Sequence, residues 1–158
     1  MSTAHFDPSR FLSAQERVYE QVVEELKAGR KRTHWMWFIF PQLAALGRSS
    51  TARFYGLESL AHAREYGQHV VLGQRLRECC ARVLSVEGRT PTQILGSPDD
   101  LKLRSCATLF EAAQPGNHVF SAVIDRMYGG RRDELTLSQL EQEASTNPAA
   151  WADEKPTP

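Results

Sequence analysis

Apolar residues recur at every third or fourth position along most of this chain, which is the spacing of a helix face. The first such stretch predicts a helix over residues 8–28, with Asp7 as its cap, Pro8 in its first turn and Gly29 at its end. Its apolar face consists of Phe11, Leu12, Val18, Val22, Val23 and Leu26. The pattern therefore predicts a long amphipathic helix in this part of the chain.

Cap residues and prolines divide the rest of the chain into further helices. These are expected over residues 49–55, 59–68 and 72–86, with a turn or short helix over 90–95. The strongest start signal is Ser97-Pro98-Asp99-Asp100, where a serine cap, a proline and two acidic residues suit the positive end of a helix. Another helix is expected between an Asn117 cap and Gly129, and the last is expected to start at Thr136.

Residues 33–47, THWMWFIFPQLAALG, cannot be assigned by periodicity. Six large apolar residues in a row suit a buried strand or a wholly buried helix, and Pro41 ends or kinks either one. A buried helix capped by Thr33 is favoured, because no partner strand appears elsewhere and an isolated strand would leave backbone groups unpaired. The predicted fold class is all-α: a compact single-domain bundle of about six to eight helices with little or no sheet.

Length and composition agree with one domain. The chain has 158 residues, of which 41% are hydrophobic and 24% charged, as in ordinary globular proteins. Residues 1–146 are expected to form the helical domain. Residues 147–158 contain three prolines and no periodicity, so they are expected to form a flexible C-terminal tail that Trp151 could pin to the body.

The cellular compartment follows from what the sequence lacks. Its longest apolar run is far shorter than the ~20 residues of a membrane span, and its first residues do not form a secretory signal. Cys79, Cys80 and Cys106 are odd in number and form no C-x-x-C motif, so buried, reduced thiols are expected. We therefore expect a cytoplasmic protein without membrane contact.

Charge is balanced in sum but uneven along the chain. Six basic and no acidic residues lie between Lys27 and Leu57, whereas six acidic and no basic residues lie between Asp133 and Glu154. An anion-binding face, two faces that attract each other and an ordinary solvated surface all fit this asymmetry. The isoelectric point near 7.0 argues against nucleic acid as a partner.

An aromatic block directly follows the basic run Arg30-Lys31-Arg32 and contains His34, Trp35, Trp37, Phe38 and Phe40. Its rings could form a stacking wall for a flat ligand beside phosphate-binding cations. They could equally form the core of the domain, as expected above all of Phe38 and Phe40. His34 could be a general acid or base, or a structural hydrogen-bonding residue.

A second polar segment, residues 99–108, carries more polar groups than a core helix needs. Lys102 and Ser105 would share one helix face, while Asp100, Arg104 and Thr108 follow each other at four-residue spacing. These groups could bind a phosphate or a ribose, or form ordinary surface ion pairs. No metal site and no cofactor are predicted, and no nucleotide-loop or nucleophile-elbow motif is present.

Four blocks of sequence carry a family resemblance. They are HWMWFIFPQLAALGRSS from residue 34, LGQRLREC from 72, DDLKLRSCATLF from 99 and GGRRDELTL from 129. From about residue 11 to 140 the chain resembles the bacterial and fungal family called domain of unknown function 1810, whose members are sometimes labelled calpastatin-like. The resemblance implies a compact helical domain and no established activity. One departure is His69-Val70, where relatives commonly have His-Pro, which suggests a structural turn at His69.

The resemblance also implies that a set of polar and aromatic positions, Pro41 among them, converges into a candidate pocket. His34 and Asp100 are the candidate proton-transfer residues of that pocket. The candidate ligand-binding residues are Lys31, Arg32, Trp35, Trp37, Gln42, Ser49, Tyr55, Lys102, Ser105, Thr108 and Asp133.

Two hypotheses on function follow. In the first, the protein binds or processes a small anionic ligand of the nucleotide or ADP-ribose type in an aromatic and basic pocket. In the second, it is a non-catalytic module that contacts a protein partner or a second copy of itself. The sequence does not decide whether the protein is an enzyme.

Overall fold

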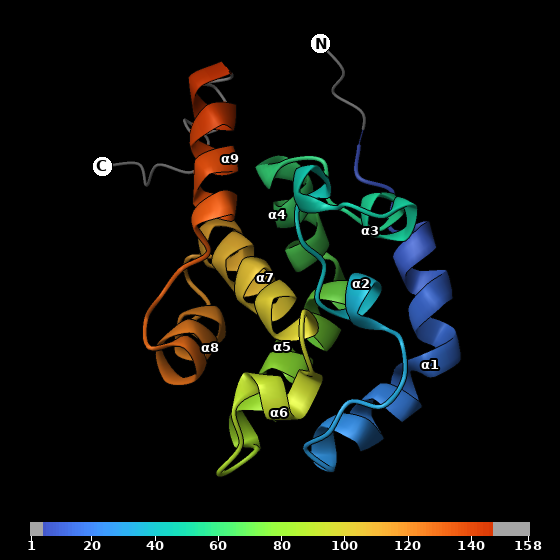
Figure 1. Ribbon diagram of the computed structural model, residues 1–158. Helices are drawn as coiled ribbons and strands as arrows, with labels where there is room; N and C mark the ends of the chain where they lie inside the picture. Colours follow the sequence, from blue (N-terminus) through green and yellow to red (C-terminus); the bar gives the residue numbers. More distant parts are fainter. Residues whose placement is uncertain (1–4, 147–158) are drawn as a thin grey trace.

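The computed structural model describes residues 5–146, and these residues form an all-α domain (Figure 1). The elements are α1 (Ser9–Lys27), α2 (Met36–Ile39), the 3-10 helix η1 (Ala44–Leu46), α3 (Ser50–Phe54), α4 (Leu60–Gln68), α5 (Val70–Ser85), α6 (Pro91–Leu95), α7 (Asp99–Ala113), α8 (Val119–Tyr128) and α9 (Glu134–Thr146). The predicted fold class is confirmed. The tail predicted for residues 147–158, including Trp151, lies outside the described residues.

Helix α7 is the centre of the arrangement, and it packs against α4, α6, α8 and α9 (Figure 1). Helix α5 lies against α1, α4 and α8. The largest fully buried side chains between these helices are aromatic, and they include Phe11, Trp35, Tyr66, Phe110 and Phe120. Phe38 and Phe40 are also buried, so the prediction that they belong to the core is confirmed.

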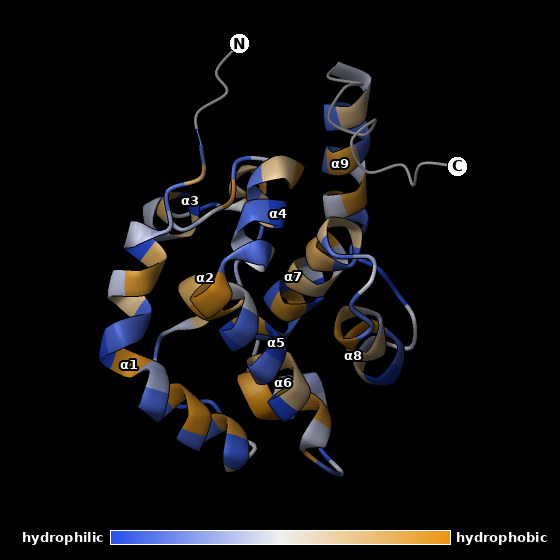
Figure 2. Ribbon diagram, turned by 180° about the vertical axis from the view of Figure 1, so that it is seen from behind, coloured by the Kyte–Doolittle hydropathy of each residue, from blue (hydrophilic) through white to orange (hydrophobic). Residues whose placement is uncertain are grey.

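The segment that periodicity left open forms the short α-helix α2 over Met36–Ile39 and, after Pro41, the 3-10 helix η1 (Figure 2). The prediction of a short buried helix is confirmed, but Thr33 does not cap it. The hydroxyl of Thr33 instead donates to the carboxylate of Glu25 at 2.6 Å, and Trp35 precedes the first helical residue. Among the described residues, strand-like pairing is limited to one isolated bridge between Leu43 and Leu57.

Three helices start at cap residues in the predicted ranges. The hydroxyls of Ser49 and Ser59 accept backbone N–H groups at the starts of α3 and α4, and Thr90 forms a capping box with Gln93. His69 caps α5 through its Nδ1 atom, which explains the turn suggested at this position.

Other predicted starts are wrong by one or two residues. Pro8 and His118, rather than Asp7 and Asn117, directly precede α1 and α8, and α5 begins at Val70 rather than at residue 72. Ser97 does not cap α7, because the helix begins at Asp99 directly after Pro98. Thr136 is not the first residue of α9, which begins at Glu134. The side chain that accepts the N–H of Thr136 is the carboxylate of Asp133.

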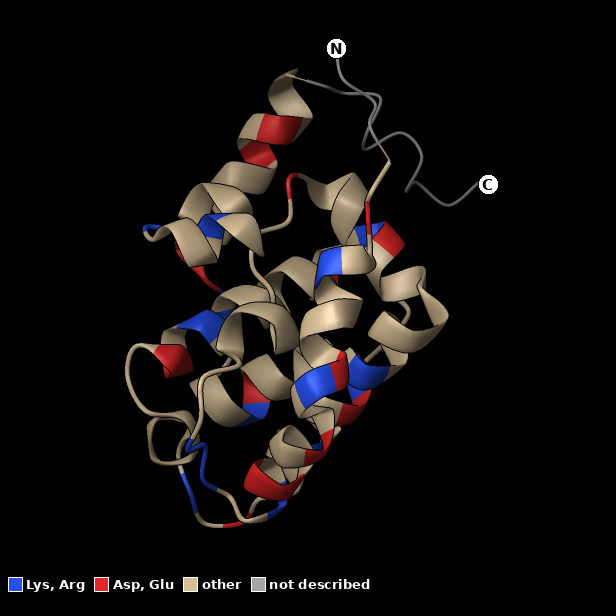
Figure 3. Ribbon diagram, turned by 90° about the vertical axis from the view of Figure 1, so that its right-hand side faces the viewer, with Lys and Arg blue, Asp and Glu red and all other residues tan. Residues whose placement is uncertain are grey.

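Three further observations bear on the expectations from composition. All three cysteines are free and buried, as predicted. Within residues 5–146, no helix is both long and apolar enough to cross a membrane. Basic and acidic segments are interspersed over the side of the molecule that Figure 3 shows, rather than being separated into two faces.

Candidate functional site

The basic and aromatic segment is fixed in place by one buried carboxylate, that of Glu25 on α1. It accepts the backbone N–H groups of Arg32 at 2.6 Å and Thr33 at 3.0 Å, the Thr33 hydroxyl at 2.6 Å, and the indole N–H of Trp35 at 3.0 Å. The amide of Gln21 donates a further bond at 2.9 Å. Burial acts to raise the pKa of Glu25, but these hydrogen bonds outweigh it and lower the pKa to about 2. The sequence reasoning did not identify Glu25.

The predicted convergence of the aromatic segment with α7 is present. The ammonium group of Lys31 lies 3.0 Å from a carboxylate oxygen of Asp99, and that of Lys102 lies 3.6 Å from the other oxygen. Lys31 also lies 5.1 Å from the ring centroid of Trp35, and Lys102 lies 5.6 Å from that of Trp37. Residues 31–37 and the first turn of α7 therefore meet through two cations, one shared carboxylate and two indole rings.

This cluster is closely packed. Trp35 is fully buried, so its ring presents no face to a ligand. Trp37 is partly exposed, and the side chain of Lys31 is only 7% exposed. Because both lysines share Asp99, the cluster of three charged groups carries one net positive charge. Arg32 and His34 adjoin it in sequence and are exposed.

Three predicted residues make contacts in other parts of the fold. The Ser49 hydroxyl accepts the N–H of Ala52 at 3.0 Å, and the Gln42 carbonyl accepts the N–H of Leu57 at 2.9 Å. The ring of Tyr55 lies 5.2 Å from that of Phe38. The first contact caps α3, and the other two link the segments before η1 and after α3 to each other and to α2.

The other predicted residues of α7 connect it to its neighbours. The carboxylate of Asp100 accepts the Thr92 hydroxyl at 2.7 Å, and its carbonyl accepts the Tyr128 hydroxyl at 2.5 Å. The buried Thr108 hydroxyl accepts the N–H of Asp133 at 2.9 Å and donates to the carbonyl of Arg104 at 2.8 Å. These bonds connect α7 with α6, α8 and the start of α9.

Two predicted residues are buried in local hydrogen bonds. The Ser105 hydroxyl donates to the carbonyl of Leu101 at 3.2 Å. The carboxylate of Asp133 accepts the N–H of Thr136 at 3.0 Å and the Thr136 hydroxyl at 2.6 Å. Asp133 is therefore the side chain that caps α9.

Replacing Asp133 by alanine is expected to lower the free energy of unfolding by about 2 kcal/mol, because the start of α9 loses its cap and the buried Thr136 hydroxyl loses its acceptor. Urea denaturation measures the change. Asp133→Asn keeps an acceptor oxygen and should recover part of the loss. The exposed neighbour Glu134 provides the control, and a loss in Glu134→Ala as large as in Asp133→Ala would contradict the capping role.

A hollow of about 570 Å³ lies between α7 and the start of α9, and we call it the arginine hollow. Its lining residues are Arg104, Arg131, Arg132, Asp133, Glu134, Leu135 and Leu137. Asp133 is the predicted site residue among them. Arg104 belongs to the polar segment noted in the sequence, but neither Arg104 nor Arg131 was predicted as a site residue.

The three arginines that line this hollow differ in how strongly acidic side chains bind them. Arg132 is engaged, because its guanidinium lies 2.6 Å from Glu111 and 3.2 Å from Asp125. Arg104 instead lies 4.0 Å from Asp133 and 5.9 Å from the ring centroid of Tyr128, and its buried Nε has no hydrogen-bond partner among the described residues. Arg131 is exposed.

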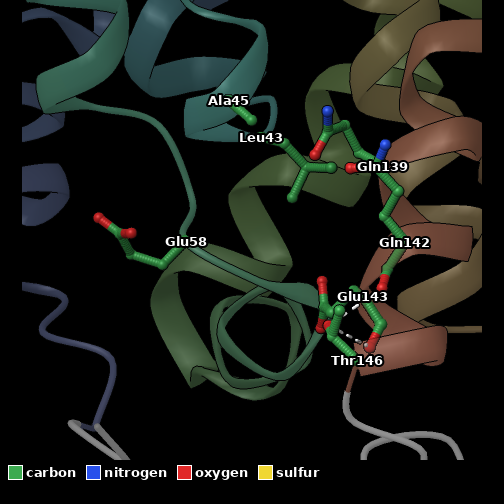
Figure 4. A pocket seen from close by; sticks show the side chains of 7 residues that line it. All are labelled: Leu43, Ala45, Glu58, Gln139, Gln142, Glu143 and Thr146. Carbon is green, nitrogen blue, oxygen red and sulfur yellow. Dashed lines mark hydrogen bonds between the residues drawn. The ribbon is translucent and has the colours of Figure 1, made fainter. Parts of the chain in front are cut away.

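A smaller hollow of about 240 Å³ lies between α9 and the segment around Leu43 (Figure 4). Gln139 and Gln142 extend from α9 toward Leu43, and Glu143 lies beside Thr146. Both carboxylate oxygens of Glu143 accept the N–H of Leu60, and burial raises the pKa of Glu143. The lining includes two acidic and no basic side chains, so this hollow does not suit an anion.

Residues 5–146 contain no group of three or more histidine, cysteine, aspartate or glutamate side chains that could hold a metal ion.

These observations define a helical domain with an aromatic core and an arginine-lined hollow beside its central helix. The family model described as "Protein of unknown function (DUF1810)" matches residues 5–140, and the chain belongs to this family. The resemblance seen in the sequence is thereby confirmed. A comparison with curated proteins gave no match.

A solved structure shows the same fold. The crystal structure of the conserved hypothetical protein Rv1873 from Mycobacterium tuberculosis is 52% identical in sequence, with a TM-score of 0.85. The match covers 86% of this chain and 97% of that one.

Proposed function

We propose that this protein binds a small anionic molecule in the arginine hollow. The observation that carries the proposal is Arg104, whose buried Nε has no acceptor among the described residues while the side chain lines an open hollow. Buried polar groups in proteins are nearly always hydrogen-bonded, and an arginine suits the oxygens of a phosphate or carboxylate. A bound anion would contact the accessible part of the guanidinium group, since the Arg104 side chain is 27% exposed.

The surroundings of Arg104 favour negative charge. Arg131 is exposed at the same hollow, and α9 begins there with the positive end of its dipole. Asp133 opposes an anion in part, but one of its oxygens is already bound to Thr136. The carboxylate of Glu134 is exposed and therefore screened by water.

The size of the hollow agrees with a small molecule, since ligand pockets commonly measure about 300–1,000 Å³. A nucleotide or an ADP-ribose-like compound belongs to the proposed class because it carries phosphate groups. Trp37 and Lys102 are a second place for the same class of ligand, although their neighbour Trp35 is buried. The roles of His34 and Asp100 in proton transfer stay predictions.

Thermal-shift measurements with inorganic phosphate, AMP and ADP-ribose, at constant ionic strength, test the proposal. A ligand of the folded state raises Tm, and we expect a saturable rise with at least one of these probes. Arg104→Gln and Arg131→Gln should each weaken binding at least tenfold. Arg17→Gln removes the same charge from the exposed face of α1 and should bind as the unchanged protein does.

Two outcomes would overturn the proposal. One is the absence of any rise with all three probes, which would favour the protein-interaction module. The other is a rise that Lys102→Ala abolishes and Arg104→Gln leaves intact, because that would move the ligand to the surface at Trp37.

A further inference from the structure

The arginine hollow is not lined by charge alone. Leu135 and Leu137 belong to its wall, and their side chains are 64% and 41% exposed. Both lie in the first turn of α9, within four residues of the Asp133 cap. A hollow for a wholly polar anion gains nothing from exposed leucines, since apolar surface left in water is unfavourable.

We infer that the ligand of this hollow is an amphipathic anion, in which a phosphate carries a short aliphatic or aromatic group. This inference rests on the proposed anion-binding function and narrows its ligand class. The phosphate binds Arg104 and Arg131, and the apolar group covers Leu135 and Leu137. Recognition then combines charge-assisted hydrogen bonds with burial of apolar area at adjoining parts of one hollow.

The positions of the lining residues support separate places for the phosphate and for the apolar group. Arg104 comes from α7, Arg131 from the turn before α9, and the two leucines from α9 itself. Arg132 is held by Glu111 and Asp125, so it fixes the turn that carries Arg131 rather than binding the ligand. With Asp133 engaged as the cap of α9, the side chains left for a ligand are two cations, two leucines and the exposed carboxylate of Glu134.

A series of phosphate monoesters tests the inference, because the headgroup stays constant while the apolar part grows. Isothermal titration with methyl, butyl and phenyl phosphate is compared with inorganic phosphate at constant ionic strength. Each methylene that becomes fully buried should strengthen binding about fourfold. We expect butyl phosphate to bind at least tenfold more tightly than methyl phosphate.

Substitutions of the two leucines test whether they cause the tighter binding of butyl phosphate. Leu135→Ser and Leu137→Ser should each reduce the advantage of butyl over methyl phosphate at least threefold and leave the affinity for inorganic phosphate unchanged. Leu101→Ser is the matched control, because Leu101 is 49% exposed on α7 and does not line the hollow. Since all three leucines are exposed, these variants should fold.

The possible outcomes distinguish failure of the amphipathic-ligand inference from failure of the proposed anion binding. If all monoesters bind as inorganic phosphate does, anion binding stands and the inference is wrong. If Leu101→Ser removes the butyl advantage as Leu135→Ser does, the apolar group lies elsewhere and the inference is also wrong. If no phosphate compound binds, the proposed function and the inference both fail.

Discussion

Replacing Glu25 by alanine is expected to lower the free energy of unfolding by about 3–5 kcal/mol. The substitution leaves the indole N–H of Trp35, the Thr33 hydroxyl and two backbone N–H groups without their acceptor in or near the core. Chemical denaturation followed by Trp fluorescence measures the loss. Glu24→Ala, at the exposed neighbouring position on α1, should change stability by less than about 0.5 kcal/mol.

The same carboxylate predicts how stability depends on pH. Because folding lowers the pKa of Glu25 from 4.5 to about 2, its ionised form contributes stability above pH 4.5. That contribution, roughly 3 kcal/mol, should be lost as the pH falls through this range toward 2. The Glu25→Ala variant should lack this part of the acid dependence. An unchanged pH profile in the variant would show that Glu25 does not hold the segment together.

The second large effect is expected from Gly73→Ala on α5. A Cβ atom at Gly73 would lie 2.1 Å from the carbonyl oxygen of Gly67, at the turn where α4 meets α5. This oxygen belongs to the backbone, so it cannot rotate away as a side chain could. It also accepts a hydrogen bond from the Arg77 guanidinium group at 3.1 Å. The helices would have to move apart, and we expect a loss of about 3 kcal/mol.

Gly116→Ala provides the control for this prediction. Gly116 has open space around it and no positive φ, so an added methyl group meets nothing. Its stability should stay within about 0.5 kcal/mol of the unchanged protein. Urea denaturation of both variants decides the matter. Equal stabilities for Gly73→Ala and Gly116→Ala would contradict the close approach of α4 and α5.

Several helix starts could be predicted from a local signal that acts within one turn. Ser49, Ser59 and Thr90 are hydrogen-bonding residues directly before apolar periodic stretches, and each caps a helix. The Thr33 prediction failed because its hydroxyl binds Glu25, eight residues away, on another helix. The residues around Thr33 give no sign that its hydroxyl would bind Glu25 rather than cap a helix.

The candidate site was harder to predict than the fold, for a related physical reason. The family resemblance implied that Lys31, Trp37 and Lys102 would lie near one another, and both lysines contact Asp99 while Lys102 also lies near the ring of Trp37. Such a cluster is closely packed when carboxylates such as Asp99 and Glu25 bind its side chains. In the sequence, both residues look like ordinary polar positions on helices. The arginine hollow forms between α7 and α9, and only the tertiary arrangement brings Arg104 to Arg131.

The most direct test of anion binding in the arginine hollow is a ¹H–¹⁵N NMR titration with inorganic phosphate that follows arginine side-chain Nε–H signals. The account predicts a saturable shift of the Arg104 Nε–H signal and of the backbone amides of residues 131–135, which sodium chloride at equal ionic strength does not reproduce. Signals that stay in place at Arg104 while those around Lys31 and Lys102 move, or no saturable shift at all, would contradict it.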